Sequence, residues 1–248
     1  MEKLDKEYCR TVLEKFLSYP LTSTNNLLDE FIKLPNAIYK LDGGKKNFVY
    51  IPGTRKDRVV LVAHADTVWD SYYYEDELCE NILSYKKGKY FNLSKKYGLG
   101  ADDRAGCAIL WILKDMGHSL LILDGEEHGQ IGANHLKKEY PDIFNEINNH
   151  NHIIQFDRRG NKDYKTYDIP VSNEYIKFIK KNTKYRCPGN NSRTDIVVLC
   201  EKVCGVNLSV GYYNEHYSSE YLVFKDWYKT LKLSYKMLSK QQDKFIIE

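Results

Sequence analysis

Residues 98–110 read GLGADDRAGCAIL, and this stretch decides the fold of the chain. Two adjacent carboxylates, Asp102 and Asp103, lie in a turn of small residues that leads directly into an apolar run with helical spacing. Aspartate is a common helix N-cap, so the stretch by itself is also typical of an ordinary turn and cap. The motifs on either side of it favour a more specific interpretation.

Acidic residues and histidines recur near apolar, strand-like runs on both sides of this stretch. They are His64 and Asp66 in VVLVAHADT (59–67), Glu126 and Glu127 in LILDGEEHG (121–129), Asp157 in IIQFDRRG (153–160), and His216 in GYYNEHYSSE (211–220). Open α/β sheets place their sites at the carboxyl ends of their strands. We therefore expect these side chains to meet at one edge of a sheet.

Helix-like and strand-like segments alternate along the chain and predict a three-layer α/β/α sandwich with a mixed, mostly parallel central sheet. Helices are expected over 5–18 (with Asp5 as cap), 24–33, 104–116, 130–140, 174–184, 194–195 and 220–242. Strands are expected over 36–42, 47–53, 58–66, 119–123, 153–156, 164–169 (exposed) and 206–210, with a hairpin within 70–97. The continuously apolar run 59–63 predicts a buried central strand.

Residues 143–152 are rich in Asn and His and predict a loop. His150 and His152 have the spacing of a metal-binding pair, but no carboxylate flanks them. We therefore interpret both as loop residues.

Composition sets the broad class of the protein. Its 248 residues are 42% hydrophobic and 29% charged, as in ordinary globular proteins. A net charge of +3, with lysine pairs scattered along the chain, argues against a nucleic-acid or membrane partner. No apolar run reaches the ~20 residues of a membrane span, and the N-terminus lacks a signal-type apolar core. Six cysteines without CxxC spacing predict free thiols and a cytoplasmic location.

Five of the singled-out residues would suffice to hold two divalent ions. Asp102 would bridge the ions, His64 and Asp157 would bind one of them, and Glu127 and His216 the other. Taken singly, each motif has a plain structural explanation, but five of them in this order favour a metal site.

Two further acids complete this hypothesis. Asp66 follows His64 by two residues and is the kind of partner that fixes the tautomer of a ligating imidazole. Glu126 lies next to the ligand Glu127 but stays outside the ligand set, free to take a proton from the water that bridges the ions. The alternative is an acidic pair at a helix N-terminus, where the helix dipole favours negative charge.

The ordered motifs resemble the co-catalytic zinc exopeptidase superfamily, which includes bacterial leucyl aminopeptidases, tripeptidase T, glutamate carboxypeptidase and acetylornithine deacetylase. The matching stretches span roughly residues 58–220 and are HAD (64–66), GADDRAG (100–106), GEEHGQIGA (125–133), Asp157 and NEHYSSE (214–220). The resemblance implies that Asp66 supports His64, that Asp102 bridges the ions and that Glu126 is the general base. It also implies a cis peptide between Asp102 and Asp103.

Members with a dimerisation lid insert about a hundred residues between these motifs. The intervals from His64 to Asp102 and from Asp157 to His216 are too short for such an insertion. We therefore expect residues 1–248 to form a single catalytic domain without a lid, closest in layout to the single-domain aminopeptidases. The absence of lid residues weakens the carboxypeptidase and deacylase interpretations.

These expectations together predict a di-zinc metallopeptidase, an aminopeptidase or small-peptide hydrolase; cobalt and manganese would also fit the ligand set. The substrate would be a small peptide. An N-acyl amino acid deacylase or amidohydrolase on the same site is the first alternative, and a non-catalytic binding protein is the second. Residues near the last ligand are candidates either for the substrate pocket or for packing: Tyr212, Tyr213, Asn214, Arg193 and Asp195.

Overall fold

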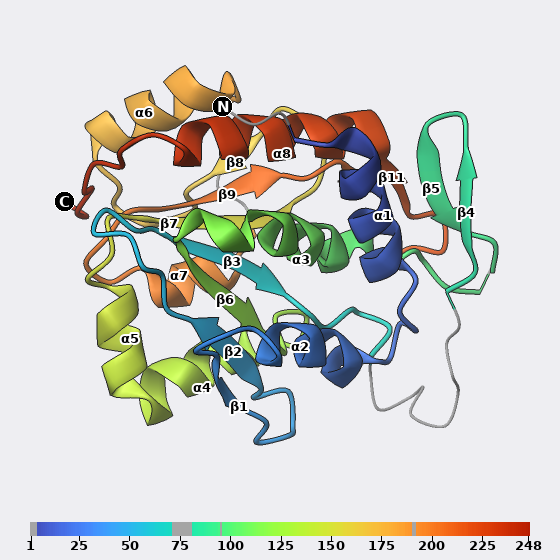
Figure 1. Ribbon diagram of the computed structural model, residues 1–248, viewed down its shortest axis with the longest axis horizontal. Coiled ribbons are helices and arrows are strands. Elements are labelled where there is room, and N and C mark those ends of the chain that lie inside the picture. The colour runs from blue at the N-terminus through green and yellow to red at the C-terminus, as the bar shows by residue number, and fades with distance from the viewer. Residues whose placement is uncertain (1–3, 71–80, 95, 190–191) are drawn as a thin grey trace.

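A seven-stranded sheet forms the centre of the protein, whose computed structural model describes residues 4–70, 81–94, 96–189 and 192–248 (Figure 1). The strand order is β1-β2-β6-β3-β7-β9-β8. The four middle strands run parallel: β6 (Ser119–Leu123), β3 (Val60–His64), β7 (Ile153–Arg158) and β9 (Gly205–Ser209). The outer strands are antiparallel to their neighbours: β1 (Ile38–Lys40), β2 (Phe48–Ile51) and β8 (Tyr164–Lys165). The predicted mixed, mostly parallel sheet is confirmed.

Helices pack on both faces of this sheet. One face is covered by α1 (Lys6–Leu17), α2 (Thr24–Ile32), α3 (Ala101–Leu113), α6 (Asn173–Thr183) and α8 (Phe224–Leu238). The other face is covered by α4 (Ile131–Glu139), α5 (Pro141–Ile147) and α7 (Asp195–Leu199). Side chains alternate between the faces, so Leu61 and Ala63 of β3 join one core and Val60 and Val62 the other. The predicted three-layer sandwich is confirmed.

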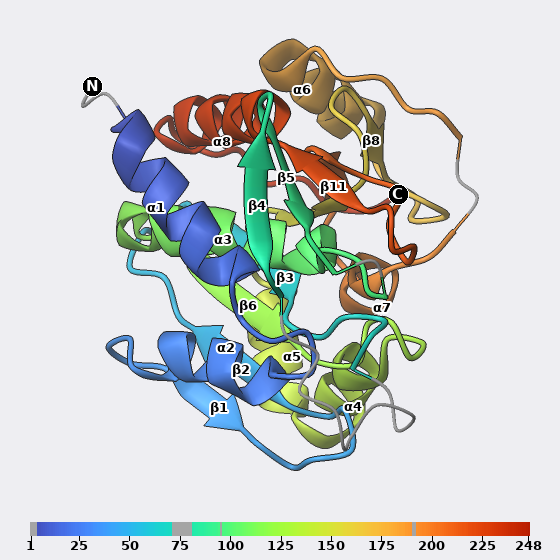
Figure 2. The same cartoon turned by 90° about the vertical axis from the view of Figure 1, so that its right-hand side faces the viewer.

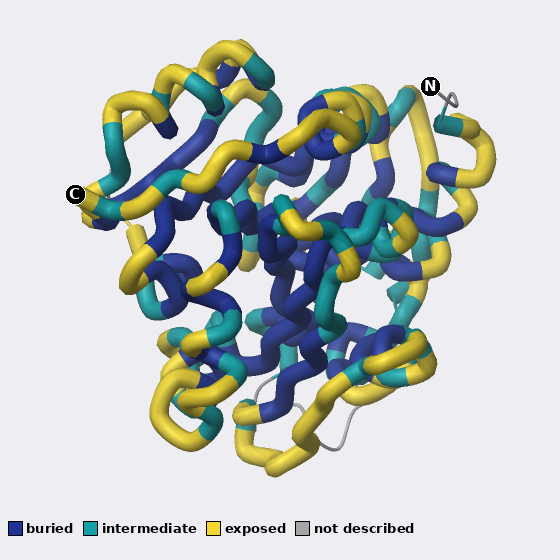
Figure 3. The backbone as a smooth tube through the Cα atoms, turned by 60° about the vertical axis from the view of Figure 1, so that its left-hand side comes forward, coloured by how far each residue is buried: buried dark blue, intermediate teal, exposed yellow. Residues whose placement is uncertain are grey.

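Two of the strands that lead to the site, β3 and β6, are completely buried. Every residue of β3 and of β6 is buried, and the backbone at the middle of the molecule is correspondingly dark in Figure 3. A continuous apolar run is typical of such strands because both of their faces are covered by helices. His64, the last residue of β3, therefore lies at the end of this buried part of the sheet.

A second, antiparallel sheet lies beside the first, in the order β10-β11-β5-β4. It consists of β4 (Leu83–Lys86), β5 (Lys89–Asn92), β10 (Tyr212–Tyr213) and β11 (Tyr221–Val223), and Figure 2 shows β4, β5 and β11 side by side. The hairpin predicted within 70–97 is β4–β5, although 71–80 and 95 lie outside the described residues. The helix predicted from residue 220 was wrong at its start, because Tyr221–Val223 pairs with β5 before α8 begins.

Two other predictions were wrong. The loop expected over 143–152 overlaps α5, whose first turn holds Pro141, a position that favours proline because its missing N–H has no partner there anyway. The exposed strand expected over 164–169 is the two-residue β8, which is buried. Tyr164 of this strand packs in one core, and Tyr167 and Ile169, which follow the strand, pack in the other.

The long interval between Asp157 and His216 belongs to these two sheets. It contains β8, β9 and β10 together with α6 and α7. Cys9, Cys107, Cys200 and Cys204 have free, buried thiols, as predicted, whereas Cys79 lies outside the described residues. None of the helices in the described part of the chain is long and apolar enough to cross a membrane.

Candidate metal centre

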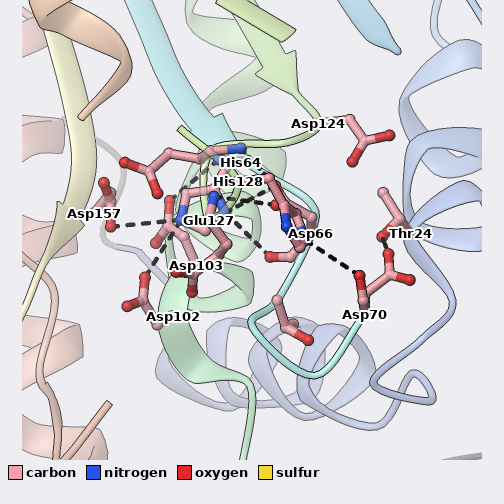
Figure 4. Close-up of polar contacts among 12 residues, drawn as sticks. Thr24, His64, Asp66, Asp70, Asp102, Asp103, Asp124, Glu127, His128 and Asp157 are labelled. Carbon is pink, nitrogen blue, oxygen red and sulfur yellow. Dashed lines mark hydrogen bonds and ion pairs between the residues drawn. The ribbon is translucent and has the colours of Figure 1, made fainter. Parts of the chain in front are cut away.

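The predicted residues meet at the carboxyl edge of the parallel strands. His64 ends β3, Glu127 follows β6 after a short turn, and Asp157 lies near the end of β7. Asp102 lies in the first turn of α3, and His216 follows β10. Figure 4 shows the side chains of His64, Asp102, Glu127 and Asp157 converging from these separate elements.

Asp102 lies between the two imidazoles. Its Oδ1 is 3.3 Å from Nε2 of His64, and its Oδ2 is 3.3 Å from Nε2 of His216. The second imidazole also lies 3.0 Å from Oε2 of Glu127. One carboxylate thus presents a different oxygen to each histidine, which is the arrangement expected of a bridging ligand.

His64 is surrounded by carboxylates. Its Nε2 lies 3.6 Å from Oδ1 of Asp157, and its Nδ1 lies 3.3 Å from Oδ1 of Asp66. Burial opposes the charged imidazole, but the carboxylates of Asp102, Asp157 and Asp66 raise the pKa of His64 well above its usual value. The carboxylates around His64 therefore favour a positive charge at this position.

Asp66 connects the histidine to the acidic pair. This fully buried carboxylate accepts the backbone N–H of Glu126 through Oδ1 and that of Glu127 through Oδ2, each over 3.2 Å. It also faces Nδ1 of His64, the ring nitrogen turned away from Asp102. The backbone carbonyl oxygen of Asp66 lies 3.1 Å from the same ring nitrogen. Asp66 therefore contacts the imidazole through both its main chain and its side chain, and it holds the turn after β6 through its carboxylate.

Asp103 and Gly106 fix the beginning of α3 against the sheet. Asp103 accepts the N–H of Gly106 over 3.0 Å through Oδ1 and the N–H of His64 over 3.4 Å through Oδ2. A Cβ at Gly106 would collide with the carbonyl oxygen of Phe156 and with the Asp103 carboxylate, so only glycine fits there. The Asp102–Asp103 peptide is cis, as the resemblance implied, and the backbone becomes regularly helical at Arg104.

Asp157 is held by partners that the sequence did not single out for this role. Its Oδ1 accepts the hydroxyl of Tyr212 over 3.1 Å, and its Oδ2 accepts the hydroxyl of Thr194 over 2.6 Å and the amide of Gln155 over 3.0 Å. Donors therefore orient both oxygens of Asp157, and Oδ1 is the oxygen that lies 3.6 Å from Nε2 of His64. No local motif marks them, because they come from three separate segments.

Glu220 is the residue that sequence reasoning missed. Its buried carboxylate accepts the N–H groups of Leu99 (2.8 Å) and Gly100 (2.7 Å) through Oε2, and that of Asp102 (3.1 Å) through Oε1. Burial, followed by the negative charge of Asp102, raises the pKa of Glu220 to about 8. Its only signal in the sequence is its place at the end of NEHYSSE, where the hypothesis assigned it no role.

The donor atoms fit divalent cations. Those of His64, Asp102 and Glu127 lie within 4.8 Å of one another, as do those of His64, Asp103 and Asp157. Among the residues that the structure describes, none hydrogen-bonds the buried atoms Nε2 of His64, Oδ1 of Asp102 and Oε1 of Glu127. Imidazole and carboxylate donors are those that zinc accepts.

Excess negative charge supports the same conclusion. Burial, and then the charge of Asp102, raises the pKa of Glu127 to about 7. Burial, and then the charge of Asp157, raises the pKa of Glu126 and of Asp103 well above their usual ranges. Acids crowded in this way ionise more easily beside a cation.

A cavity of about 680 Å³ opens beside the site and is lined by Arg159, Tyr213, Asn214, Glu215, His216 and Tyr217. The His216 side chain is 45% exposed, so the centre is reached from this side. Of the pocket candidates, Tyr213 and Asn214 line this cavity. Tyr212 and Asp195 are buried, and Arg193 is exposed but does not line this cavity.

The sequence matches no family model, and no curated protein matches it. Solved structures match its fold over nearly the whole chain. The aminopeptidase PepT of Bacillus cereus has a TM-score of 0.65 at 14% identity and covers 95% of this chain and 98% of its own. The aminopeptidase APDkam598 of the archaeon Desulfurococcus kamchatkensis has a TM-score of 0.65 at 12% identity, with coverages of 95% and 96%. The TET1 peptidase of Pyrococcus horikoshii, which can assemble into a tetrahedron or a large octahedral shell, has a TM-score of 0.63 at 14% identity, with coverages of 93% and 99%.

These similarities show that the chain has an aminopeptidase fold. The fold that the resemblance of its motifs implied is thereby confirmed. At such low identities a shared fold does not specify the reaction, which depends on the side chains of the site.

Proposed function

We propose that the protein is a metal-dependent hydrolase, most specifically a di-zinc aminopeptidase or small-peptide hydrolase. The observation that carries the proposal is the position of Asp102. Its Oδ1 lies 3.3 Å from the imidazole of His64, and its Oδ2 lies 3.3 Å from that of His216. An ordinary helix N-cap would direct its carboxylate to backbone N–H groups. The carboxylate of Asp102 instead faces His64 and His216, two potential metal ligands.

The proposed ligands divide into two sets that share Asp102. His64 and Asp157 would hold one ion, and Glu127 and His216 the other. Two divalent ions held by these residues would lower the pKa of a bound water and polarise a carbonyl group. Zinc is the metal that we propose, with cobalt and manganese as the other ions suited to these donors.

Glu126 is the proposed general base. Its backbone N–H is fixed by Asp66, and its carboxylate pKa is raised above the usual range, first by burial and then by Asp157. A carboxylate of raised pKa can take a proton from the attacking water and return it to the leaving nitrogen. Asp66 touches neither water nor substrate and is a positioning residue.

Substrate would enter beside His216. The cavity there is lined by tyrosines and by the Arg159–Glu215 ion pair, at 2.9 Å, and its volume of about 680 Å³ suits a short peptide. We also propose that residues 1–248 act as one catalytic domain with no lid inserted between the ligands. The intervals that could hold a lid instead supply strands to the two sheets.

Mass spectrometry of a mixed peptide pool tests the function. The pool is incubated with zinc-loaded protein, and Glu126→Gln protein of measured zinc content serves as the control. The proposal predicts ladders shortened from the N-terminus with the parent protein only. An untouched pool together with release of amino acid from N-acetyl substrates would establish the deacylase. Hydrolysis undiminished in Glu126→Gln would refute the assigned base.

A further inference from the structure

A second cavity, the basic groove, lies between α1, the β4–β5 hairpin and the beginning of α8. Its volume is about 670 Å³, and none of the proposed metal ligands lines it. Seven of the residues that line it carry a positive charge: Lys6, Arg10, Lys87, Lys89, Lys225, Lys229 and Lys232. The basic groove is therefore a separate site with a charge opposite to that of the acidic metal centre.

The fold gathers these cations from three segments that are far apart in the sequence. Two of them lie one turn apart on α1, and two lie at the tip of the β4–β5 hairpin. The three lysines of α8 are spaced four and three residues apart, which places them on one side of the helix. The hairpin tip touches the beginning of α8, where the N–H of Phe224 donates to the carbonyl of Gly88 over 3.1 Å (Figure 2).

Aromatic rings hold two of the cations in place. The guanidinium of Arg10 lies 4.7 Å from the ring centre of Tyr85 and 4.8 Å from that of Phe224, so it joins α1 to the hairpin and to α8. Nζ of Lys232 lies 5.1 Å from the ring centre of Tyr228. Contacts of this kind orient a cation without neutralising its charge.

The protein does not balance the positive charge of the basic groove. Asp226 is the only acid among the described residues that line it, and its Oδ2 accepts the hydroxyl of Tyr213 over 2.8 Å. Seven cations and one acid give a net charge of +6, twice the +3 of the whole chain. Within the described part of the chain, no ion pair joins any of the seven cations to an acid.

The cations also disfavour one another. Burial, and then the positive charge of Lys162, lowers the pKa of Lys229. A concave surface lined by charges of one sign concentrates the opposite charge in solution. The basic groove therefore favours an anion that carries several charges within a small volume.

We propose that the basic groove binds a linear chain of phosphoryl groups, from either inorganic polyphosphate or a nucleoside triphosphate. Lysine ammonium groups bind phosphate oxygens as point charges, and the guanidinium of Arg10 can donate two hydrogen bonds to one phosphoryl group. A volume of about 670 Å³ suits a small ligand more than a membrane surface. An acidic peptide fits less well, because an extended chain directs successive side chains to opposite sides. Binding at this groove is independent of the proposed hydrolysis.

Calorimetric titration with tripolyphosphate tests the proposal. Affinity should fall about tenfold or more in the double variant Lys225→Glu, Lys232→Glu, because two attractive charges become repulsive. Both side chains are exposed, so the substitutions leave the core intact. The double variant Lys177→Glu, Lys236→Glu makes the same change of net charge at exposed positions outside the groove, and its affinity should stay within about twofold. Orthophosphate should bind about tenfold or more weakly than tripolyphosphate.

Magnesium-free ATP separates the two sources of the phosphoryl chain. An affinity for ATP above that for tripolyphosphate assigns the groove to a nucleotide, and an equal or lower one assigns it to inorganic polyphosphate. The titration is repeated after chelator treatment, which should leave the affinity unchanged. Binding that is lost with the metal, or that falls equally in both double variants, would overturn the proposal.

The absence of tripolyphosphate binding up to about 1 mM would overturn it as well. Single-stranded RNA and phosphatidylserine vesicles are therefore titrated in parallel. If either of them binds where tripolyphosphate does not, and loses affinity in Lys225→Glu, Lys232→Glu, the groove belongs to that partner and the proposal is wrong.

Discussion

Asp66 and Glu126, sixty positions apart in the chain, are joined by a hydrogen bond from the backbone N–H of Glu126 to Oδ1 of Asp66 over 3.2 Å. The same oxygen lies 3.3 Å from Nδ1 of His64. The backbone carbonyl oxygen of Asp66 lies 3.1 Å from the same nitrogen. The orientation of a proposed metal ligand and the position of the proposed base therefore depend on one buried residue. Disturbing it should affect metal binding and proton transfer together.

Replacing Asp66 by Asn tests this dependence. In the asparagine side chain an NH₂ group replaces one carboxylate oxygen. This group cannot accept a hydrogen bond, so the backbone N–H of Glu126 or of Glu127 loses its acceptor. Loss of such a supporting partner typically lowers metal affinity or activity by about 10–100-fold. Zinc affinity is measured against a competing chelator, with Asp142→Asn on the exposed end of α5 as the control. Unchanged affinity in Asp66→Asn would contradict the role given to Asp66.

Glu220 should be essential although it is not a ligand. In Glu220→Gln the amide nitrogen faces either the N–H of Asp102 or those of Leu99 and Gly100, and the segment before α3 is displaced. We expect hydrolysis to fall by at least about tenfold, since small displacements of positioned groups are costly. Zinc content and kcat are measured together, with Glu174→Gln on the exposed surface of α6 as the control. Full activity would show that Asp102 does not depend on this contact.

Zinc should stabilise the fold. The ion relieves repulsion among buried carboxylates in the native state and finds no preformed site in the unfolded chain. At a free zinc concentration about 100 times the Kd, the free energy of unfolding should rise by about 2.7 kcal/mol. Urea denaturation with and without chelator measures this difference, and His64→Ala should abolish most of it. Identical midpoints in zinc and in chelator would argue against a metal centre.

Acid should destabilise the protein through two histidines far from the metal centre. Burial lowers the pKa of His150 to about 4 and that of His152 to about 3. Their usual pKa is ~6.5, so below that pH the unfolded chain binds more protons than the native protein. The stabilisation from each neutral imidazole is complete above about pH 6.5 and is lost as the pH falls toward the native pKa. The expected slope is about 1.4 kcal/mol per pH unit for each histidine.

Urea denaturation of chelator-treated protein between pH 5 and 6.5 measures this slope. His152→Phe removes one titrating group and keeps a ring among Tyr175, Phe178 and Phe245, whose centroids lie 5.3–5.7 Å from that of His152. The slope should fall by about 1.4 kcal/mol per pH unit in this variant. An unaltered slope would assign the acid sensitivity to other groups.

Patterns within one segment predicted the framework of the fold. Asp5 caps α1 as expected, and the apolar runs of β3 and β6 gave central buried strands at the predicted positions. Such features follow from local periodicity and capping chemistry. The strand Tyr221–Val223 could not be separated from the amphipathic helix after it, because its pairing with β5 is a contact across the chain.

In the candidate site, too, some features could be predicted from local patterns and others could not. Histidines and acids next to apolar runs indicated which side chains would meet, since parallel strands end at one edge. The contacts that orient them were not predictable, because Glu220 reaches Asp102 across 118 positions and Tyr212 reaches Asp157 across 55. A single acid or tyrosine in the sequence forms no periodic pattern from which such a distant partner could be predicted.

The late positions of His216 and Glu220 in the sequence determine when the proposed centre can form during synthesis. β3 emerges from the ribosome early, but His216 and Glu220 follow β9 and β10, after most of the chain has been translated. A nascent polypeptide therefore carries an incomplete set of donors for most of its elongation. If translation stops before these residues, the fragment would lack part of the proposed ligand set and should bind no metal at this site.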